Sequence, residues 1–283
     1  MSDTAGTSNK VWFITGASSG FGRAFARHAI DRGYHVVATA RDPVRLAELV
    51  AQAPDRVAAL RLDVDRPEDA DAAIAAARAR FGRIDVLINN AGFAVLGAVE
   101  ETCDADLRAQ MNTNFFGAMA VTRAALPLLR AQRFGAIVNI SSMGGQMSFP
   151  GFGAYSASKF ALEGATEALA QEMAPFGVKV MIVEPGAFRT DLVGLAMRQM
   201  PEIAAYAEVV GPTRAFAQAM HQTQAGDPAK AAAAIEAALA SDATPLRLAL
   251  GADAVDAIRA HAQKLLADLA AWEETARATA FQG

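Results

Sequence analysis

The sequence Val11-Trp12-Phe13-Ile14-Thr15-Gly16-Ala17-Ser18-Ser19-Gly20-Phe21-Gly22 joins a short apolar run to a loop that contains three glycines. The apolar run at 11–15 predicts a buried strand, and the helix formers at 23–32 predict a helix that Gly33 ends. Strand, glycine loop and helix in this order favour phosphate binding, because glycines permit close approach and a helix N-terminus offers N–H donors. The spacing is Gly-x-x-x-Gly-x-Gly, not the common Gly-x-Gly-x-x-Gly, so an ordinary tight turn is the alternative interpretation.

The rest of the chain continues the alternation of strands and helices. Further strands are expected at 35–39, 56–62, 85–88, 135–140, 178–183 and 246–250, and helices at 67–80, 104–130, 161–173 and 228–240. This alternation predicts right-handed crossovers and a doubly wound α/β fold with about seven parallel strands in a single domain. We expect residues 1–10 to be a flexible N-terminus, residues 11–283 the domain, residues 192–226 a mobile lid over the substrate, and residues 252–280 an amphipathic tail helix.

The composition narrows the class of protein. Of 283 residues, 53% are apolar and 20% charged, which suits a large buried core. A net charge of -4 does not provide the excess of positive charge that is typical of nucleic-acid binding. Cys103 is the one cysteine of the sequence, so no intrachain disulfide can form. The first ten residues lack the apolar core of a signal peptide, and no run approaches the ~20 apolar residues of a membrane span. We therefore expect a cytoplasmic protein with no nucleic-acid partner, no membrane partner and no metal site.

The end of the second predicted strand bears on the choice of cofactor. In dinucleotide-binding folds, an acidic residue at this place binds the adenosine ribose 2′-hydroxyl and repels a 2′-phosphate. Ala40 stands here, and Arg41 follows with a guanidinium suited to phosphate. We therefore expect NADP(H) as the preferred cofactor and NAD(H) as the second choice. A solvent-facing arginine at the start of a loop is the alternative interpretation of Arg41.

Polar residues follow the other predicted strands, at the edge where open parallel sheets bind ligands. Asp63 and Val64 follow the third strand, the segment 89–92 follows the fourth, and Ser141 and Ser142 follow the fifth. In the segment 89–92, the two asparagines could hold neighbouring strands, contact the ligand, or do both. Asn114 lies inside an apolar helical stretch, where it predicts a kink, a cap of a broken helix or a polar role.

Tyr155 and Lys159 stand at i and i+4 in the stretch Gly151-Phe152-Gly153-Ala154-Tyr155-Ser156-Ala157-Ser158-Lys159. In a helix this spacing places both side chains on one face, one turn apart. A phenol with a pKa near 10 is a poor acid or base at neutral pH, but a nearby ammonium favours the phenolate. A lone Tyr-x-x-x-Lys occurs often by chance, so its weight depends on the other motifs.

Together these motifs resemble those of the classical short-chain dehydrogenase/reductase family over roughly residues 10–192. The matching segments are Thr15–Gly22, Asn89–Gly92, Asn114, Ser142, Tyr155 with Lys159, and Pro185-Gly186. Their order and spacing make the match specific, and Phe21, which stands where the family usually has Ile or Leu, is expected to alter only packing. The resemblance implies the strand order 3-2-1-4-5-6-7 and reversible carbonyl–alcohol oxidoreduction.

The resemblance also implies a role for each residue of the candidate site. Tyr155 is the general acid/base, Lys159 lowers its pKa and holds the nicotinamide ribose, and Ser142 stabilises charge on the substrate oxygen. Ser142 is preferred to Ser141 by its separation from the tyrosine, and Asn114 is expected to hold a water that links Lys159 to solvent. The residues expected to contact the cofactor are Gly16, Ser18, Ser19, Gly20, Phe21, Gly22, Arg41, Asp63, Val64, Asn90, Ala91, Gly92, Tyr155, Lys159, Pro185, Gly186, Phe188 and Thr190.

The substrate is less well defined by the sequence. Beside Ser142 and Tyr155, an apolar pocket is expected from Phe93, Met143, Phe149, Phe152 and Leu192, although such residues also suit an ordinary core. A small-residue stripe on the helix after Tyr155 predicts a subunit interface of a homodimer or homotetramer, with packing on the chain's own sheet as the alternative; it comprises Ala157, Ala161, Gly164, Ala165 and Ala168.

The sequence thus predicts an NADP(H)-dependent oxidoreductase that interconverts a carbonyl, either ketone or aldehyde, and an alcohol on a hydrophobic small molecule. An NAD-dependent alcohol dehydrogenase of the same fold and a non-catalytic dinucleotide-binding sensor are the alternatives.

Overall fold

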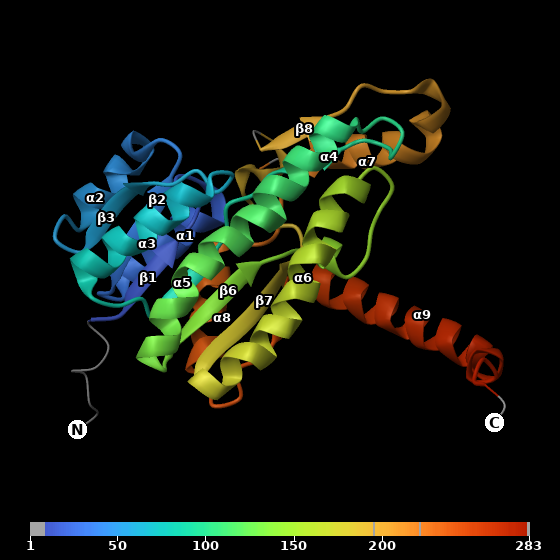
Figure 1. Ribbon diagram of the computed structural model, residues 1–283. Helices are drawn as coiled ribbons and strands as arrows, with labels where there is room; N and C mark the ends of the chain where they lie inside the picture. Colours follow the sequence, from blue (N-terminus) through green and yellow to red (C-terminus); the bar gives the residue numbers. More distant parts are fainter. Residues whose placement is uncertain (1–8, 195, 221, 282–283) are drawn as a thin grey trace.

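In the computed structural model, which describes residues 9–194, 196–220 and 222–281, the described residues form a central sheet of seven parallel strands (Figure 1). The strands are β1 (Val11–Ile14), β2 (His35–Ala40), β3 (Val57–Arg61), β4 (Val86–Asn89), β6 (Gly135–Ile140), β7 (Val178–Pro185) and β9 (Arg247–Leu250). Their spatial order is β3-β2-β1-β4-β6-β7-β9, which confirms the predicted order and the doubly wound fold. Most of the expected flexible N-terminus, residues 1–8, lies outside the described residues.

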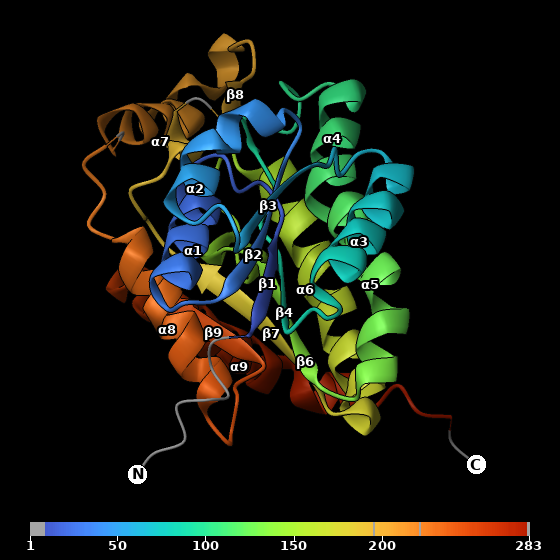
Figure 2. The same ribbon diagram turned by 90° about the vertical axis from the view of Figure 1, so that its left-hand side faces the viewer.

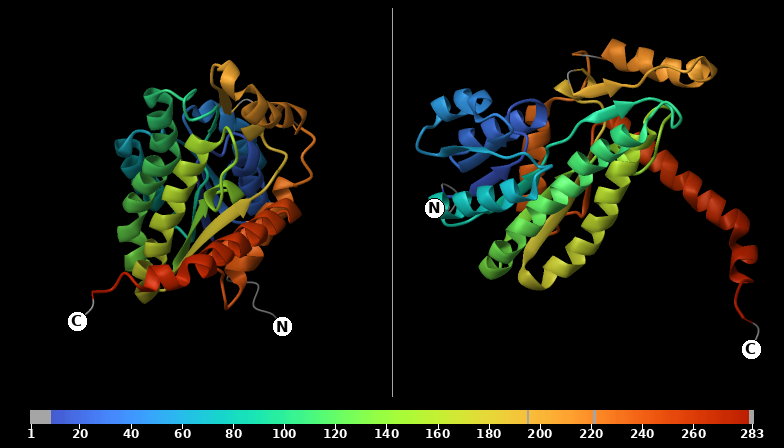
Figure 3. Two further views of the ribbon diagram at one scale, coloured as in Figure 1. Left: turned by 90° about the vertical axis from the view of Figure 1, so that its right-hand side faces the viewer. Right: turned by 45° about the horizontal axis from the view of Figure 1, so that its top comes forward.

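Helices cover both faces of the sheet, as Figure 2 shows from the sheet's edge. On one face lie α1 (Gly20–Asp31), α2 (Ala47–Gln52) and α8 (Pro228–Ala240). On the other lie α3 (Pro67–Phe81), α5 (Ala118–Gln132) and α6 (Gly153–Met173), with α4 (Asp104–Met111) leading into α5. The last helix, α9 (Ala252–Arg277), follows β9 and runs away from the rest of the molecule (Figures 1 and 3). No described helix has both the length and the apolar character needed to cross a membrane.

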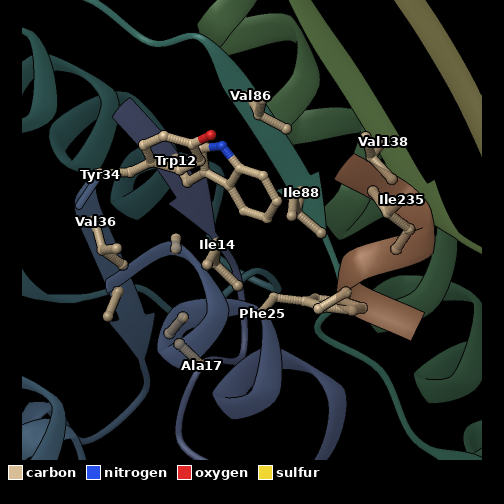
Figure 4. Close-up of a cluster of buried hydrophobic side chains, with 14 of the residues drawn as sticks. Trp12, Ile14, Ala17, Phe25, Tyr34, Val36, Val86, Ile88, Val138 and Ile235 are labelled. Atoms are coloured by element: carbon tan, nitrogen blue, oxygen red, sulfur yellow. The ribbon is translucent and has the colours of Figure 1, made fainter. Parts of the chain in front are cut away.

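The core is divided by the sheet because side chains alternate along each strand. Trp12 and Ile14 point into one apolar cluster, which Phe25 of α1 and Ile235 of α8 complete (Figure 4). The neighbouring residues Val11 and Phe13 point into the cluster on the opposite face, beneath α3, α5 and α6. The short β1 is buried on both faces, and its position therefore fixes where the glycine loop begins.

The helix expected at 104–130 is interrupted. Its middle, Asn112–Gly117, forms a π-helical turn between α4 and α5, which confirms the predicted irregularity at Asn114. A Cβ on Gly117 would approach the Val64 side chain to 2.9 Å, so glycine allows this turn to pass close to the end of β3.

The segment 192–226 contains ordered elements that the sequence did not predict. Its short strand β8 (Met197–Gln199) pairs in parallel with β5 (Ala94–Leu96), and its helix is α7 (Ala207–Met220). Arg214 of α7 donates a 2.7 Å hydrogen bond to Glu101, and both side chains are almost fully buried. Residues 195 and 221 of this segment lie outside the described residues. A mobile lid remains a prediction. The β5–β8 pairing and the Arg214–Glu101 pair are the contacts that attach this segment to the rest of the domain.

The small-residue stripe lies on the outward side of α6. Ala157, Gly164 and Ala168 are exposed, and Ala161 and Ala165 are half-buried. The alternative that this stripe packs against the chain's own sheet is therefore wrong for its exposed members, and its role as a subunit interface stays a prediction.

Candidate active site

The carboxyl ends of six strands meet around one large cavity of about 700 Å³. The segments after β1, β2, β3, β4, β6 and β7 all contribute residues to its wall. This edge, where the strand order reverses from β1 to β4, is the usual ligand site of an open parallel sheet. The cavity therefore lies where the sequence predicted the cofactor.

The glycine loop supplies a cradle at one side of this cavity. Gly16 has φ +66°, a left-handed conformation that glycine adopts without strain, and the segment carries Ser18, Ser19, Gly20 and Phe21 along the wall. A Cβ on Gly22 would overlap the carbonyl oxygen of Gly16, so only glycine lets α1 begin this close to the loop. Backbone N–H groups at the start of α1 and an unobstructed loop fit the diphosphate of a dinucleotide.

Two asparagines have structural roles. Asn90 Nδ2 donates to the carbonyl oxygens of Thr15 and Gly16, at 2.9 and 3.2 Å, while Thr15 Oγ1 accepts from the backbone N–H of Asn90 at 2.8 Å. Asn89 Nδ2 donates to Thr122 and Asn139, each at 2.8 Å. The prediction that the two asparagines hold neighbouring strands by hydrogen bonds is confirmed. Asn90, Ala91 and Gly92 also line the cavity.

The rim beyond β2 carries positive charge. Ala40 is buried, Arg41 is exposed, and both line the cavity, together with Asp63 and Val64 at the end of β3. Arg45 also lines it and was missed by sequence reasoning, although its spacing of four from Arg41 could have indicated it. Asp42 lies between the two arginines in the sequence, and its Oδ1 accepts the backbone N–H of Val44 at 3.1 Å to cap the following 3-10 turn. Asp65 lines the cavity as well.

Tyr155 and Lys159 lie on the buried face of α6, as predicted, and both line the cavity. Lys159 Nζ lies 5.7 Å from the centre of the Tyr155 ring and donates a 2.8 Å hydrogen bond to the Ile140 carbonyl at the end of β6. The ammonium is therefore held against the sheet edge beside the phenol.

Burial governs the protonation of this pair. It raises the pKa of Tyr155 to about 12, with a hydrogen bond from Ser142 opposing the rise and the negative charge of Glu163 adding to it. Burial likewise lowers the pKa of Lys159 to about 8, and Glu163 counteracts this change. Loss of hydration thus outweighs the hydrogen bond from Ser142. That Lys159 lowers the pKa of Tyr155 stays a prediction.

The two serines after β6 point to different partners. Ser142 is half-buried, and its Oγ accepts the backbone N–H of Gly144 at 3.0 Å. Ser141 is buried, and its hydroxyl donates to Glu163 Oε1 at 2.5 Å. Glu163 also accepts a hydrogen bond from Gln146, so its carboxylate holds both ends of the turn that follows Ser142. A Cβ on Gly145 would overlap this carboxylate, which shows how closely the turn packs on it.

Glu163 belongs to a buried charge cluster that the sequence did not predict. Arg247 of β9 bonds to Glu163 at 2.6 Å and to Glu184 of β7 at 2.5 Å, and both carboxylates are almost fully buried. Burial and then the charge of Glu163 raise the pKa of Glu184, while bonds to three carboxylates raise the pKa of Arg247 despite its own burial. Glu163 follows Lys159 by four residues, so the repeat of Tyr155, Lys159 and Glu163 was a usable signal. Arg247 had none.

Asn114 clamps the backbone beside the cavity. Its Oδ1 accepts the N–H of Phe93 at 3.1 Å, and its Nδ2 donates to the Phe93 carbonyl at 3.0 Å and to Ser158 at 3.1 Å. The π-helical turn brings the amide to this place.

The turn after β7 closes the cavity from a third side. Pro185, Gly186, Phe188 and Thr190 all line it, and the Phe188 ring lies 5.1 Å from that of Phe21. Asp253 at the start of α9 accepts the backbone N–H of Ala187 at 2.6 Å and was missed by sequence reasoning. The root of α9 thus fixes this turn.

The predicted apolar pocket for the substrate stays a prediction, and its residues lie at different places around the cavity. Phe93 and Leu192 line the cavity, but Met143, Phe149 and Phe152 are not among the described residues of its wall. Phe149 is exposed, and Phe152 packs edge-on against Tyr155 at 6.1 Å. The turn after Ser142 passes beside Tyr155, since a Cβ on Gly144 would lie 3.4 Å from the Tyr155 ring. Arg198 of β8, which was not predicted, lines the wall and stacks over Phe93 at 4.4 Å.

Comparisons with known proteins agree with this geometry. The family model for short chain dehydrogenases matches residues 10–200. Oxidoreductase BOA17 of Botryotinia fuckeliana is 40% identical over 276 residues, which cover 96% of this chain and 99% of that protein. The chain belongs to the short-chain dehydrogenase family. It is therefore an oxidoreductase that acts on CH–OH groups, with a nicotinamide dinucleotide as its cofactor.

Solved structures of short-chain dehydrogenases share the fold over most of the chain. One from Streptomyces avermitilis is 53% identical, has a TM-score of 0.92, and covers 97% of this chain and 100% of its own. One from Burkholderia phymatum, in complex with NAD, is 25% identical with a TM-score of 0.79, and it covers 89% of this chain and 92% of its own. An alcohol dehydrogenase from Thermococcus sibiricus, complexed with 5-hydroxy-NADP, is also 25% identical, with a TM-score of 0.70, and it covers 85% of this chain and 95% of its own.

Proposed function

We propose that this short-chain dehydrogenase interconverts a carbonyl and an alcohol on a hydrophobic small molecule, with NADP(H) preferred to NAD(H). The observation that carries the proposal is the burial of Tyr155 and Lys159 side by side in the cavity that the glycine loop also lines. A non-catalytic dinucleotide sensor would have no use for this pair beside Ser142.

Each of these residues has a distinct task in the proposal. When bound, the cofactor supplies or accepts the hydride. Tyr155 exchanges a proton with the substrate oxygen, and Ser142 donates a hydrogen bond to that oxygen as charge develops on it. With a pKa of about 12, the Tyr155 phenol is protonated at neutral pH, which suits it as the proton donor in carbonyl reduction. Lys159 places a positive charge beside it and holds the cofactor ribose.

Asn114 is proposed to serve the same proton path. Its carboxamide oxygen accepts one hydrogen bond from Phe93, and an amide oxygen has two lone pairs. The second lone pair can accept from a water that leads toward Lys159, while the first keeps the Phe93 backbone in place.

The preference for NADP(H) is supported by charge at the adenosine end. Arg41 and Arg45 both line the cavity there, and Ala40 leaves the acidic position of an NAD site without a carboxylate. Asp42 is already engaged in capping the next turn. Asp63 and Asp65 also line the cavity, and Asp65 accepts a hydrogen bond from Thr113. The guanidinium groups of Arg41 and Arg45 are suited to bind an additional phosphate by charge-assisted hydrogen bonds.

Reduced-cofactor absorbance with a panel of ketones, aldehydes and secondary alcohols tests the proposal. Turnover should occur with NADPH or NADP⁺ and should be lost in Tyr155→Phe, while fluorescence titration shows that the variant still binds cofactor. Turnover of Tyr155→Phe within a few-fold of wild type would refute the role of Tyr155. A kcat/KM that favours NADH would refute the cofactor assignment alone.

A further inference from the structure

The helix α9 carries an apolar seam on a surface that faces solvent. Apart from its first turns, the helix stands away from the body of the molecule (Figure 3), and every residue from Ala262 to Ala280 is exposed. Nevertheless Leu265, Leu269 and Trp272 are 55, 64 and 68% exposed. Large exposed apolar patches of this kind mark interaction sites in soluble proteins.

The spacing of this seam indicates what covers it. Apolar residues recur at alternating intervals of three and four, at Val255, Ile258, Ala262, Leu265, Leu269, Trp272 and Ala276. An unbroken three-four repeat over three heptads is the a/d pattern of a coiled coil, whose partner is another helix. Leu266, which is 66% exposed, lies beside this seam at heptad position e and widens it in the middle heptad.

We propose that α9 pairs with α9 of a second copy of this chain as an antiparallel two-helix coiled coil. The 26-residue helix is about 39 Å long, which is enough for three heptads of contact. Three large side chains from each copy, with the smaller seam residues, bury on the order of 1,000 Å² in total, near the lower bound of a stable interface.

Charges beside the seam select the antiparallel orientation. In a parallel pair, Asp268 at heptad position g faces Glu273 at the following e position of the partner copy, and the two carboxylates repel each other. In the antiparallel pair that sets Val255 against Trp272, position g faces g, and Asp268 meets His261, which can donate a hydrogen bond to it. If the two helices shift by one heptad so that they overlap less, the two Asp268 carboxylates meet and repel each other. The register that sets Val255 against Trp272 is therefore favoured.

The match to a solved structure extends into α9. The Streptomyces avermitilis protein covers 97% of this chain with a TM-score of 0.92. The uncovered 3% is smaller than α9, which makes up 26 of 283 residues, so most of α9 lies within the matched stretch.

Light scattering of the full-length protein over a range of concentrations tests the pairing. Leu269→Glu places a charge in the seam and should halve the mass of the assembly, raising the dissociation constant at least tenfold. Ala267→Glu adds the same charge on the opposite side of α9 and should leave the mass unchanged. A monomeric wild type, an unchanged mass for Leu269→Glu, or an equal loss in both variants would overturn the proposal.

Cross-linking tests the orientation. In a Cys103→Ser background, a mixture of the Ile258→Cys and Leu269→Cys proteins should form disulfide-linked dimers, because these positions face each other in the favoured register. Neither variant should cross-link efficiently alone. A parallel pair would cross-link Leu269→Cys with itself, and that result would overturn the antiparallel assignment. Binding of the monomeric chain to anionic vesicles through Trp272, seen by its fluorescence, would assign the seam to a lipid surface instead.

Discussion

Glu163 gives the most direct test of the electrostatics around Tyr155 and Lys159. Glu163→Gln removes a buried negative charge while nearly preserving the shape of the side chain. Because the carboxylate raises the pKa of both Tyr155 and Lys159, its removal should lower both values. The ionised form of Tyr155, which accepts the proton in alcohol oxidation, should then appear at lower pH.

The size of the shift follows from the position of Glu163 on α6. Glu163 lies eight residues after Tyr155 on this helix, a rise of about 12 Å. Two charges at that distance interact by about 1.4 kcal/mol at an effective dielectric constant of ~20. This energy corresponds to about 1 pKa unit. Glu184 offsets part of it, because its own pKa falls once Glu163 is neutral and it then carries more negative charge. We expect the pKa of Tyr155 to shift by about 0.5 to 1 unit.

The assay is kcat/KM for alcohol oxidation as a function of pH. The rising limb of the profile should move toward lower pH in Glu163→Gln. The matched control is Glu167→Gln, since Glu167 also bonds to Arg247 at 2.6 Å but is half exposed and a turn farther from Lys159. The reasoning is refuted if both variants shift equally, if neither shifts, or if the Glu163→Gln limb moves toward higher pH.

Three further predictions concern the same cavity. Arg41→Ala combined with Arg45→Ala should lower the NADP(H)/NAD(H) ratio of kcat/KM by one to two orders of magnitude, since a charge-assisted hydrogen bond contributes roughly 1.5–3 kcal/mol; an unchanged ratio would show that neither guanidinium meets the phosphate. Lys159→Met should increase the free energy of unfolding of the cofactor-free protein at pH 7 by up to about 3 kcal/mol, because burial lowers the folded-state pKa of Lys159 from 10.5 to about 8. Between pH 8 and 10.5 the unfolded chain binds the Lys159 proton more tightly than the folded protein does, so the wild type becomes more stable as pH rises. Urea titrations should therefore show the difference in free energy of unfolding between Lys159→Met and wild type decreasing over this range. A difference that does not change with pH would contradict this reasoning. Gly22→Ala should weaken cofactor binding at least tenfold in fluorescence titration and destabilise the fold by about 1–3 kcal/mol, because its Cβ overlaps the Gly16 carbonyl; wild-type affinity would mean that the loop is not the cradle.

The sequence predicted those features of the fold and site that depend on residues close together in the chain. Each strand of the central sheet carries its own apolar run, and a right-handed crossover leaves few choices of order. Residues directly after a strand reach the C-terminal edge whatever the remaining packing, so Arg41, Asn90 and Ser142 were placed in the cavity wall. That Tyr155 and Lys159 share one face of a helix could be predicted from the helix period alone.

Features that depend on distant contacts could not be predicted. Strands β5 and β8 contain three residues each, too few for a period-two pattern to be recognised. The course of the loop after Ser142 could not be predicted, because it depends on Glu163, on which Gly145 packs. The pKa of Tyr155 depends most on its burial, which is a property of the whole fold and cannot be read from the i and i+4 spacing.

The link between Arg247 and Glu163 bears on how the enzyme is made. Arg247 follows Glu163 by 84 residues in the chain. A ribosome that adds ~5–20 residues per second needs roughly 4–17 s to synthesise that interval. Glu184 precedes Arg247 by 63 residues, so over that later part of the interval both carboxylates are present without Arg247. Burying the two carboxylates together without this arginine is unfavourable. We therefore expect the first strands and the glycine loop to assemble on the nascent chain before the catalytic half of the sheet, which should close after β9 has been translated.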